Sequence, residues 1–185
     1  MCSSDLLPGF LELCQPEDAS LWLGELASAE RRLIMIHTLA SSFPVDVWGD
    51  SGWQRAPAAR YRGPATHRVQ AAKVYAGATI NLDIGRLYQM DIMTMRVPDV
   101  LASGGFLIAE RSETLAELFR EGEHLEAWAS VEELHQKVSY YLKNPQKARE
   151  IALQGQAHVR AHHSIRARLE QMLFDIPLKI GRAHV

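Results

Sequence analysis

The sequence predicts an α/β protein with a Rossmann-like, doubly wound parallel sheet and extra helices after the sheet. The first observation is a set of short apolar stretches that suit buried strands. The second is their alternation with helical segments of about ten residues, which is typical of parallel sheets covered on both faces. The expected strands are residues 45–48, 78–84, 106–109 and 125–129, with a small strand at 60–62.

Helical segments are expected before, between and after the strands. Residues 16–42 carry leucine and isoleucine at helix-compatible spacings, and residues 98–103 form a short helix before the next strand. Gly104 and Gly105 are interpreted as a left-handed helix end and a tight entry into that strand. The remaining helices are expected over 66–75, 112–120, 130–142, 144–162 and 164–174.

The two ends of the chain are treated separately. Residues 1–6 and 180–185 resemble one sequencing adapter translated from opposite strands, and we expect both to be library scars. The rest is about one domain long and apolar enough to bury a core. We expect an N-terminal helical segment over 7–44, a Rossmann-like domain over 45–174 and a tail over 175–185.

Composition narrows the classes of partner. A formal net charge of −2 and a pI near 6.4 do not call for a nucleic acid. With Cys2 in the suspected scar only Cys14 remains, so no disulfide or metal-type cysteine spacing is available. His158 and His162 lack a third ligand, so we interpret them as surface histidines and expect no metal. No apolar run approaches the roughly 20 residues needed to span a bilayer, and no signal peptide is visible, so we expect a cytoplasmic protein.

Two acidic residues mark the most informative segment. Asp91 and Asp99, with seven residues between them, flank a loop and the expected start of a helix. Carboxylates accept hydrogen bonds from sugar hydroxyls, whereas the free N–H groups and the dipole of a helix start attract phosphate. The combination suits a nucleotide-sugar.

Basic and amide side chains lie near the same segment. Arg96 could neutralise a diphosphate through its fork of donors, or could instead pair with Asp99 or Asp91. Arg86, in the loop after the strand, could contact phosphate. Asn81 could order the loop that would contact the nucleotide-sugar donor, or it could be a hydrogen-bonded residue of the sheet.

The chain resembles the C-terminal domain of GT-B glycosyltransferases in several segments: INLDI, MRVPDVLASGGFLIAE, LAELF and SVEELHQKVSYYLKNPQKAREIALQGQAHVRAHHS. The resemblance covers about residues 30–172 and is nearest to the branch that includes spore-maturation-type enzymes. It implies the C-terminal half of a GT-B fold, which binds the nucleotide-sugar donor. A second Rossmann-like domain that binds the acceptor would then be missing from the N-terminal side.

The family pattern also implies roles for single residues. In retaining members, two acidic residues with seven between them contact the donor, the first at the sugar and the second at the ribose. The resemblance places Asp99 at the second position and, by spacing, Asp91 at the first. Pro98 replaces an aromatic residue or leucine, and suggests that the helix begins there. The family's basic pair for the diphosphate is not recognisable in this sequence.

The resemblance implies an enzyme that moves a sugar from a nucleotide diphosphate to an acceptor hydroxyl, without a cofactor. Catalytic residues and the identity of nucleotide, sugar and acceptor stay open. The domain alone is expected to bind nucleotide weakly and to transfer little or nothing. Two alternatives also stay open: a nucleotide-sugar epimerase, which needs acid–base residues that do not stand out here, and a non-catalytic binding or spore-coat module.

Overall fold

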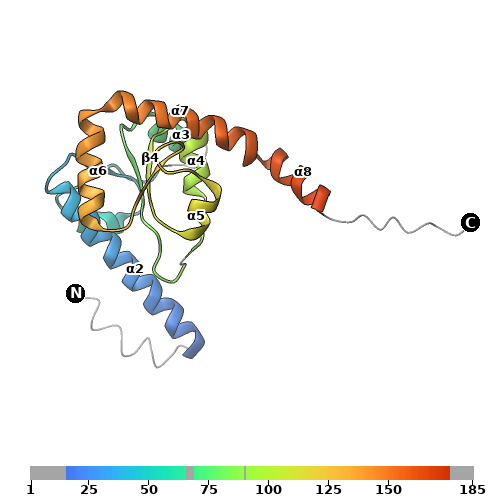
Figure 1. Ribbon diagram of the computed structural model, residues 1–185. Coiled ribbons are helices and arrows are strands. Elements are labelled where there is room, and N and C mark those ends of the chain that lie inside the picture. The colour runs from blue at the N-terminus through green and yellow to red at the C-terminus, as the bar shows by residue number, and fades with distance from the viewer. Residues whose placement is uncertain (1–15, 66–68, 90, 176–185) are drawn as a thin grey trace, which may run out of the picture.

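The computed structural model describes residues 16–65, 69–89 and 91–175. Figure 1 shows parallel strands between two layers of helices, with the last helix extending away from the body. The helices are α2 (Pro16–Ala40), α3 (Val69–Gly77), α4 (Arg96–Ala102), α5 (Glu113–Leu118), α6 (Val131–Lys143), α7 (Pro145–His162) and α8 (Ile165–Asp175), with a 3₁₀ helix η2 (Ser51–Arg55). The strands are β1 (Asp46–Val47), β2 (Arg60–Tyr61), β3 (Asn81–Asp83), β4 (Leu107–Glu110) and β5 (Glu126–Trp128).

The strands form two parallel groups, which confirms the predicted fold class. Strands β3, β4 and β5 pair in that order, with Leu82 aligned to Ile108. Strand β1 pairs with β2, with Asp46 aligned to Arg60. The strands are shorter than the apolar stretches that predicted them, because only the residues that pair with a neighbour join the ladder. The stretch at 78–84, for example, contributes three residues to β3.

Successive side chains of a strand point to opposite faces of the sheet. Ile108 and Trp128 contribute to one apolar cluster, and Leu107 and Ala127 contribute to another. We call the side of Ile108 the first face and the side of Leu107 the second face. Both faces are apolar because helices cover both of them.

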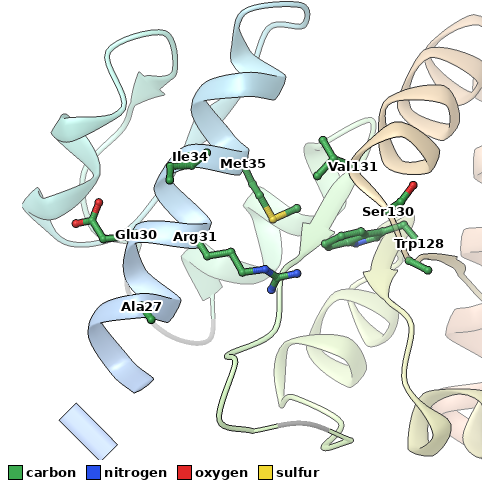
Figure 2. Close-up of a pocket in the computed structure, with 9 residues that line it drawn as sticks. Ala27, Glu30, Arg31, Ile34, Met35, Trp128, Ser130 and Val131 are labelled. Carbon is green, nitrogen blue, oxygen red and sulfur yellow. The ribbon is translucent and has the colours of Figure 1, made fainter. Parts of the chain in front are cut away.

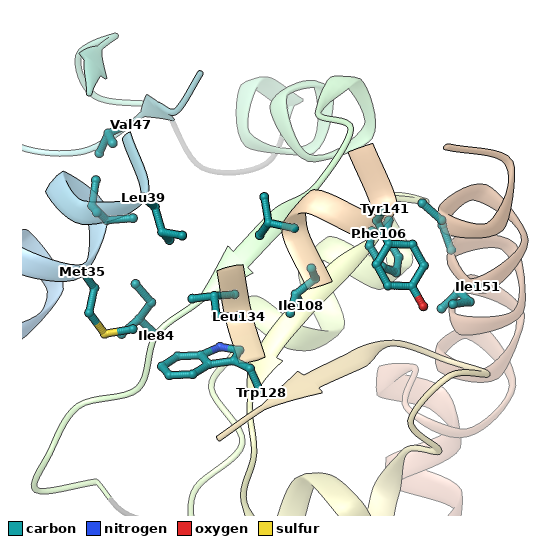
Figure 3. Close-up of a cluster of buried hydrophobic side chains, with 14 of the residues drawn as sticks. Met35, Leu39, Val47, Ile84, Phe106, Ile108, Trp128, Leu134, Tyr141 and Ile151 are labelled. Carbon is teal, nitrogen blue, oxygen red and sulfur yellow. The ribbon is translucent and has the colours of Figure 1, made fainter. Parts of the chain in front are cut away.

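Helices α2 and α6 cover the first face. Met35 and Leu39 of α2 and Leu134 of α6 pack around Ile108 and Trp128, as Figure 3 shows. Full burial of one such side chain contributes about 1.5–3 kcal/mol. Helix α2 therefore shares its core with the sheet.

The second face is covered by α4, α5 and part of α7. Val100 and Leu101 of α4, Leu115 of α5 and Val159 of α7 are buried in one cluster with Leu107. This layer fixes α4 against the sheet and so positions the start of α4 near the end of β3.

Side-chain caps explain where α5 and α6 begin. Ser112 Oγ accepts a hydrogen bond of 3.1 Å from the Leu115 N–H at the start of α5. Ser130 Oγ accepts one of 3.1 Å from the Glu133 N–H, and the Glu133 carboxylate accepts one of 2.9 Å from the Ala129 N–H. Caps of this kind satisfy N–H groups that have no partner within the helix.

Helix α4 differs from the prediction at its start. It begins at Arg96, so Pro98 is its third residue and not its first. Proline is tolerated there because the first four N–H groups of a helix have no intrahelical acceptor. After the helix, Gly104 takes a φ of +80° and its N–H donates to the Leu101 carbonyl at 2.9 Å.

The suspected scars at 1–6 and 180–185, together with Cys14, lie outside the described residues. Across the parts of the chain that the structure describes, no helix combines the length and hydropathy needed to cross a bilayer.

Candidate functional site

The carboxyl ends of β3, β4 and β5 meet at one edge of the sheet, where open parallel sheets bind ligands. Strand β3 ends at Asp83 and β4 ends at Glu110. Helix α2 crosses this edge, and Ser28 Oγ accepts a hydrogen bond of 2.9 Å from the Leu87 N–H. The loop after β3, residues 84–95, is therefore held against α2.

An ion pair between a buried carboxylate and an exposed guanidinium joins β3 to α4. Asp83 is 4% exposed, and its carboxylate accepts a hydrogen bond of 2.9 Å from Thr94 Oγ1 and pairs with the Arg96 guanidinium. A buried carboxylate is tolerated only when such donors replace its water. Arg96 thus pairs with Asp83, and not with Asp99 or Asp91 as the sequence had suggested.

Arg86 ties the loop after β3 to α2. Its guanidinium donates to Glu25 Oε1 at 3.0 Å and to the Tyr88 hydroxyl at 2.7 Å. The Tyr88 hydroxyl in turn donates to Glu25. This hydrogen bond, and then burial, raises the pKa of Tyr88. The charge of Arg86 is therefore partly matched by Glu25.

Arg32 completes a group of three arginines at this edge. Its Nε donates to the Ser28 carbonyl at 3.2 Å. Burial lowers the pKa of Arg32, and the nearby positive charges of Arg86 and Arg96 lower it further. Among the described residues, no carboxylate forms an ion pair with Arg32. We call Arg32, Arg86 and Arg96 the arginine cluster; among the described residues, only its Arg32 charge has no carboxylate at ion-pair distance.

A hollow of about 510 Å³ lies along the same edge, between α2 and the end of β5 (Figure 2). The Arg31 guanidinium points towards Trp128 there and lies 5.8 Å from the centre of the indole ring. Arg31 also pairs with Glu110, with 3.0 Å between Nη1 and Oε2. Glu110 in addition accepts a hydrogen bond of 2.9 Å from the Gly85 N–H. Because Glu110 neutralises the charge of Arg31, this hollow suits an apolar group better than an anion.

Asp99 stands exposed on the first turn of α4. It follows Arg96 by three positions, and residues with this spacing are neighbours on a helix surface. None of the described residues bonds to its carboxylate. It lines neither the hollow beside Trp128 nor the larger one between β1 and β3. Asp99 is therefore an exposed acid three positions after Arg96 that lines neither hollow.

Asp91 is an anchor between the loop and α5. Its carboxylate accepts a hydrogen bond of 2.8 Å from the Thr114 N–H, and its carbonyl accepts one of 2.7 Å from Thr114 Oγ1. Its φ of +61° is uncommon for a residue other than glycine. The structure does not place Asp91 as a second free acid beside Asp99, because one of its carboxylate oxygens already holds α5.

Asn81 lies at the opposite end of β3 from Asp83. Its buried amide donates to the Tyr75 carbonyl at 3.0 Å and to the Phe106 carbonyl at 3.1 Å. Of the two alternatives left open for Asn81, the structure thus shows the hydrogen-bonded one: its amide joins β3 to α3 and to the residue before β4, and does not order the loop after β3. A Cβ on Gly105 would lie 2.6 Å from the Tyr75 carbonyl oxygen, so this packing requires glycine.

The sequence interpretation missed Arg32, although a signal was present. Ser28, Arg32, Ile36 and Leu39 follow one another at spacings of four, four and three, so they share one face of α2. The other three are buried in the structure. A guanidinium on an apolar stripe needs a partner or a ligand.

The described parts of the chain hold no group of three or more His, Cys, Asp and Glu side chains placed to bind a metal ion. His162 is exposed, as expected, but His158 is half-buried. The His158 ring stacks on His124 with 4.0 Å between centroids, so His158 is not an ordinary surface histidine.

The parallel sheet and its two helical layers match the fold of GT-B glycosyltransferases of known structure. HepE of Anabaena, solved with UDP and glucose, has a TM-score of 0.59 at 16% identity, over 77% of this chain and 44% of that one. A glycosyltransferase of Rickettsia africae has a TM-score of 0.62 at 14% identity, over 77% and 42%. Sucrose-phosphate synthase of Thermosynechococcus elongatus has a TM-score of 0.59 at 14% identity, over 77% and 42%.

The family follows from the sequence itself. Residues 31–174 match the glycosyl transferase-like family, and the chain belongs to that family. No curated protein sequence matches the chain. The chain spans less than half the length of each of the three structures.

Proposed function

We propose that this chain is the donor-binding domain of a glycosyltransferase that moves a sugar from a nucleoside diphosphate to an acceptor hydroxyl. The observation that carries the proposal is that Arg32 and Arg96 line one hollow, while Arg86 lies in the loop that bonds to Ser28 of α2. Membership of the glycosyl transferase-like family supports it, as does the likeness to HepE, which was solved with UDP and glucose.

The arginine cluster binds the diphosphate of the donor. When the bond between the sugar and the diphosphate breaks, negative charge grows on the departing phosphate. Fixed cations at that position stabilise the transition state more than the bound donor. Arg32 is the main contact, because Arg86 and Arg96 already share their charges with Glu25 and Asp83.

The two acidic residues serve the neutral parts of the donor. The Asp99 carboxylate accepts hydrogen bonds from the ribose hydroxyls, since it is exposed and unbonded among the described residues. Asp91 positions the loop through Thr114, and its second carboxylate oxygen is left for the sugar.

A second Rossmann-like domain, N-terminal to this one, carries the acceptor site. The coverage of only 44% of the HepE chain supports this arrangement. The isolated chain then binds the donor but transfers little or no sugar. Within the family, we place the chain nearest the spore-maturation-type branch on its sequence segments.

Titration calorimetry of the 185-residue chain with UDP-glucose, GDP-mannose and ADP-glucose tests the proposal. We expect one donor to bind, and Arg32→Ala to weaken it about 10- to 100-fold, since a hydrogen bond to a charged group contributes about 1.5–3 kcal/mol. Arg149→Ala, on the exposed side of α7, is the matched control and should leave binding unchanged. Absence of binding by all three donors, or equal loss in both variants, contradicts the proposal.

Product analysis of the full-length enzyme separates transfer from epimerisation. A transferase releases a free nucleoside diphosphate for each sugar moved, whereas an epimerase returns the donor with its diphosphate bond intact. Recovery of an intact, epimerised donor would contradict the transferase assignment.

A further inference from the structure

Glu25 of α2 bonds to two side chains of the loop after β3. Its Oε1 atom accepts a hydrogen bond of 3.0 Å from the Arg86 guanidinium and another from the Tyr88 hydroxyl. Arg86 in turn donates to the Tyr88 hydroxyl at 2.7 Å. The three side chains therefore form a closed triangle of hydrogen bonds, and Glu25 supplies its negative charge.

Glu25 also lies close to Arg32. The two residues are seven positions apart on α2, which is nearly two full turns, so they share one face of the helix. Burial and the charges of Arg86 and Arg96 lower the pKa of Arg32, and the negative charge of Glu25 partly offsets these effects. Glu25 is therefore an acid beside two members of the arginine cluster.

The carboxylates of Glu25 and Asp83 hold their arginines in different surroundings. Asp83 is buried and is also held by Thr94, so a ligand that removed Arg96 would leave a buried charge without its cation. The Glu25 side chain is 34% exposed and that of Arg86 is 42% exposed. An exposed ion pair contributes little free energy, because water can replace either partner. Arg86 is therefore easier for a ligand to recruit than Arg96.

The bond to Glu25 leaves most of the Arg86 guanidinium available. Both side-chain hydrogen bonds of Arg86 come from its Nη1 atom, so its Nε and Nη2 groups have no acceptor among the described residues. A guanidinium binds phosphate best through two parallel hydrogen bonds. A diphosphate, with several acceptor oxygens, can therefore satisfy Arg86 more fully than Glu25 does.

We propose that Glu25 is a positioning residue for Arg86 that competes with the diphosphate of the nucleotide-sugar donor. This inference rests on the proposed function. Before the donor binds, Glu25 holds Arg86 and the loop after β3 against α2. The diphosphate then displaces the carboxylate, and Arg86 joins Arg32 in contacting phosphate. When the nucleoside diphosphate leaves, Glu25 takes Arg86 back, which favours release of the product.

Titration calorimetry of the 185-residue chain with UDP and with inorganic pyrophosphate tests the proposal. Glu25→Gln keeps the size of the side chain and removes its charge. We expect both ligands to bind about two- to fivefold more tightly to this variant, the factor that corresponds to one exposed ion pair. Glu170→Gln is the matched control, because it removes the same charge from another exposed pair, with Arg166 on α8. It should leave both affinities unchanged.

Two results would overturn the proposal. Unchanged or weaker binding of both ligands to Glu25→Gln would show that the carboxylate supports the site and does not compete for it. Equal gains in Glu25→Gln and Glu170→Gln would show that net charge alone controls the affinity.

Pyrophosphate separates this inference from the proposed function. If UDP binds to the unmodified chain and its affinity does not rise in Glu25→Gln, the competition is wrong and the proposed function stands. If no nucleotide or nucleotide-sugar binds to either protein, the proposed function is wrong. Tighter binding of pyrophosphate to Glu25→Gln would then still support competition between Glu25 and an anion for Arg86.

Discussion

At the scale of single residues, nearby carboxylates decide which arginine at the sheet edge can receive an anion. Three arginines have such a partner: Arg31 with Glu110, Arg86 with Glu25 and Arg96 with Asp83. Arg32 has no such partner among the described residues, and the positive charges of Arg86 and Arg96 lower its pKa. An anionic ligand at this position relieves that repulsion.

Substitution of Arg96 should lower the free energy of unfolding, because the buried Asp83 carboxylate then lacks its positively charged partner. In Arg96→Met the Asp83 carboxylate keeps only Thr94 as a side-chain donor, so we expect the free energy of unfolding to fall by about 1–3 kcal/mol. Urea denaturation measures it. Arg166→Met is the control, because its pair with Glu170 is exposed and should contribute less than about 1 kcal/mol. Equal effects of both substitutions would contradict the account.

Some site residues could be predicted from the sequence, and others could not. Arg86 and Arg96 follow a predicted strand, and the loop after a parallel strand lies at the binding edge by geometry alone. Arg32 reaches the same edge from α2, and its neighbours there come from segments far along the chain. The role of Asp91 was likewise hidden, because it depends on Thr114, 23 positions away.

At the scale of elements, α7 packs closely against the segment before β5. A Cβ on Gly155 of α7 would collide with the His124 carbonyl oxygen and lie 3.0 Å from Leu101 Cδ2. Only glycine lets α7 approach this closely. The close approach also brings the histidines of α7 against those of neighbouring segments.

Gly155→Ala should therefore destabilise the protein. We expect a loss of at least about 1–3 kcal/mol, because backbone atoms must move to admit the methyl group. Gly77→Ala is the control: its Cβ would meet nothing within 4 Å, so stability should be unchanged or slightly higher. Thermal unfolding followed by circular dichroism compares them, and similar melting temperatures for the two variants would refute the packing argument.

A cluster of histidines joins the end of α7 to the turn before β5. The His163 ring stacks on Phe119 with 4.9 Å between centroids and lies 3.4 Å from His158, nitrogen to nitrogen. Arg168 of α8 bonds to the other ring nitrogen of His163 at 2.8 Å. Burial, followed by the charge of Arg168 and the neighbouring histidines, lowers the pKa of His163 to about 4. Burial also lowers the pKa of His124.

The depressed pKa of His163 predicts a loss of stability in acid. The unfolded chain takes up the proton near pH 6.5 and the folded chain only near pH 4, so stability is complete above pH 6.5 and falls as the pH drops towards 4. We expect His163→Phe, which keeps the stacking on Phe119, to flatten this dependence. Denaturation between pH 7 and pH 4 measures it, and parallel curves for both proteins would contradict the assignment.

Element types were easier to predict than element bounds. Apolar stretches and capping residues such as Ser130 indicated strands and helix starts, because both signals are local. The short length of β3 was not predictable, since the ladder depends on its neighbours in space. The start of α4 was predicted two residues late, because Pro98 fits the third helical position as well as the first.

At the scale of the whole molecule, the apolar surface is concentrated where elements lack neighbours. Helix α8 extends away from the body in Figure 1. It exposes a set of large apolar side chains: Ile165, Leu169, Met172, Leu173 and Phe174. Such a surface contributes little burial to this domain and favours association with another apolar surface.

Truncation after Ser164 should therefore leave the domain folded. We expect the melting temperature to change by less than about 4 °C, because residues 165–174 bury little surface. The truncated chain should also self-associate less. Calorimetry and sedimentation test both expectations, and a large fall in melting temperature would show that α8 contributes to the core.

The class of fold could be predicted from the sequence, whereas the gap in its sheet could not. Alternating strands and helices predicted one parallel sheet, and both faces are covered as expected. The space between β1 and β3 could not be predicted, because local patterns do not report which strands become neighbours.

The central claim is that a nucleoside diphosphate binds at the arginine cluster. The most direct measurement is a crystal structure of the chain with UDP. The account predicts a phosphate oxygen within about 3 Å of the Arg32 guanidinium, close to Arg96 at the start of α4. UDP in the hollow beside Trp128, with Arg32 free of phosphate, would contradict it.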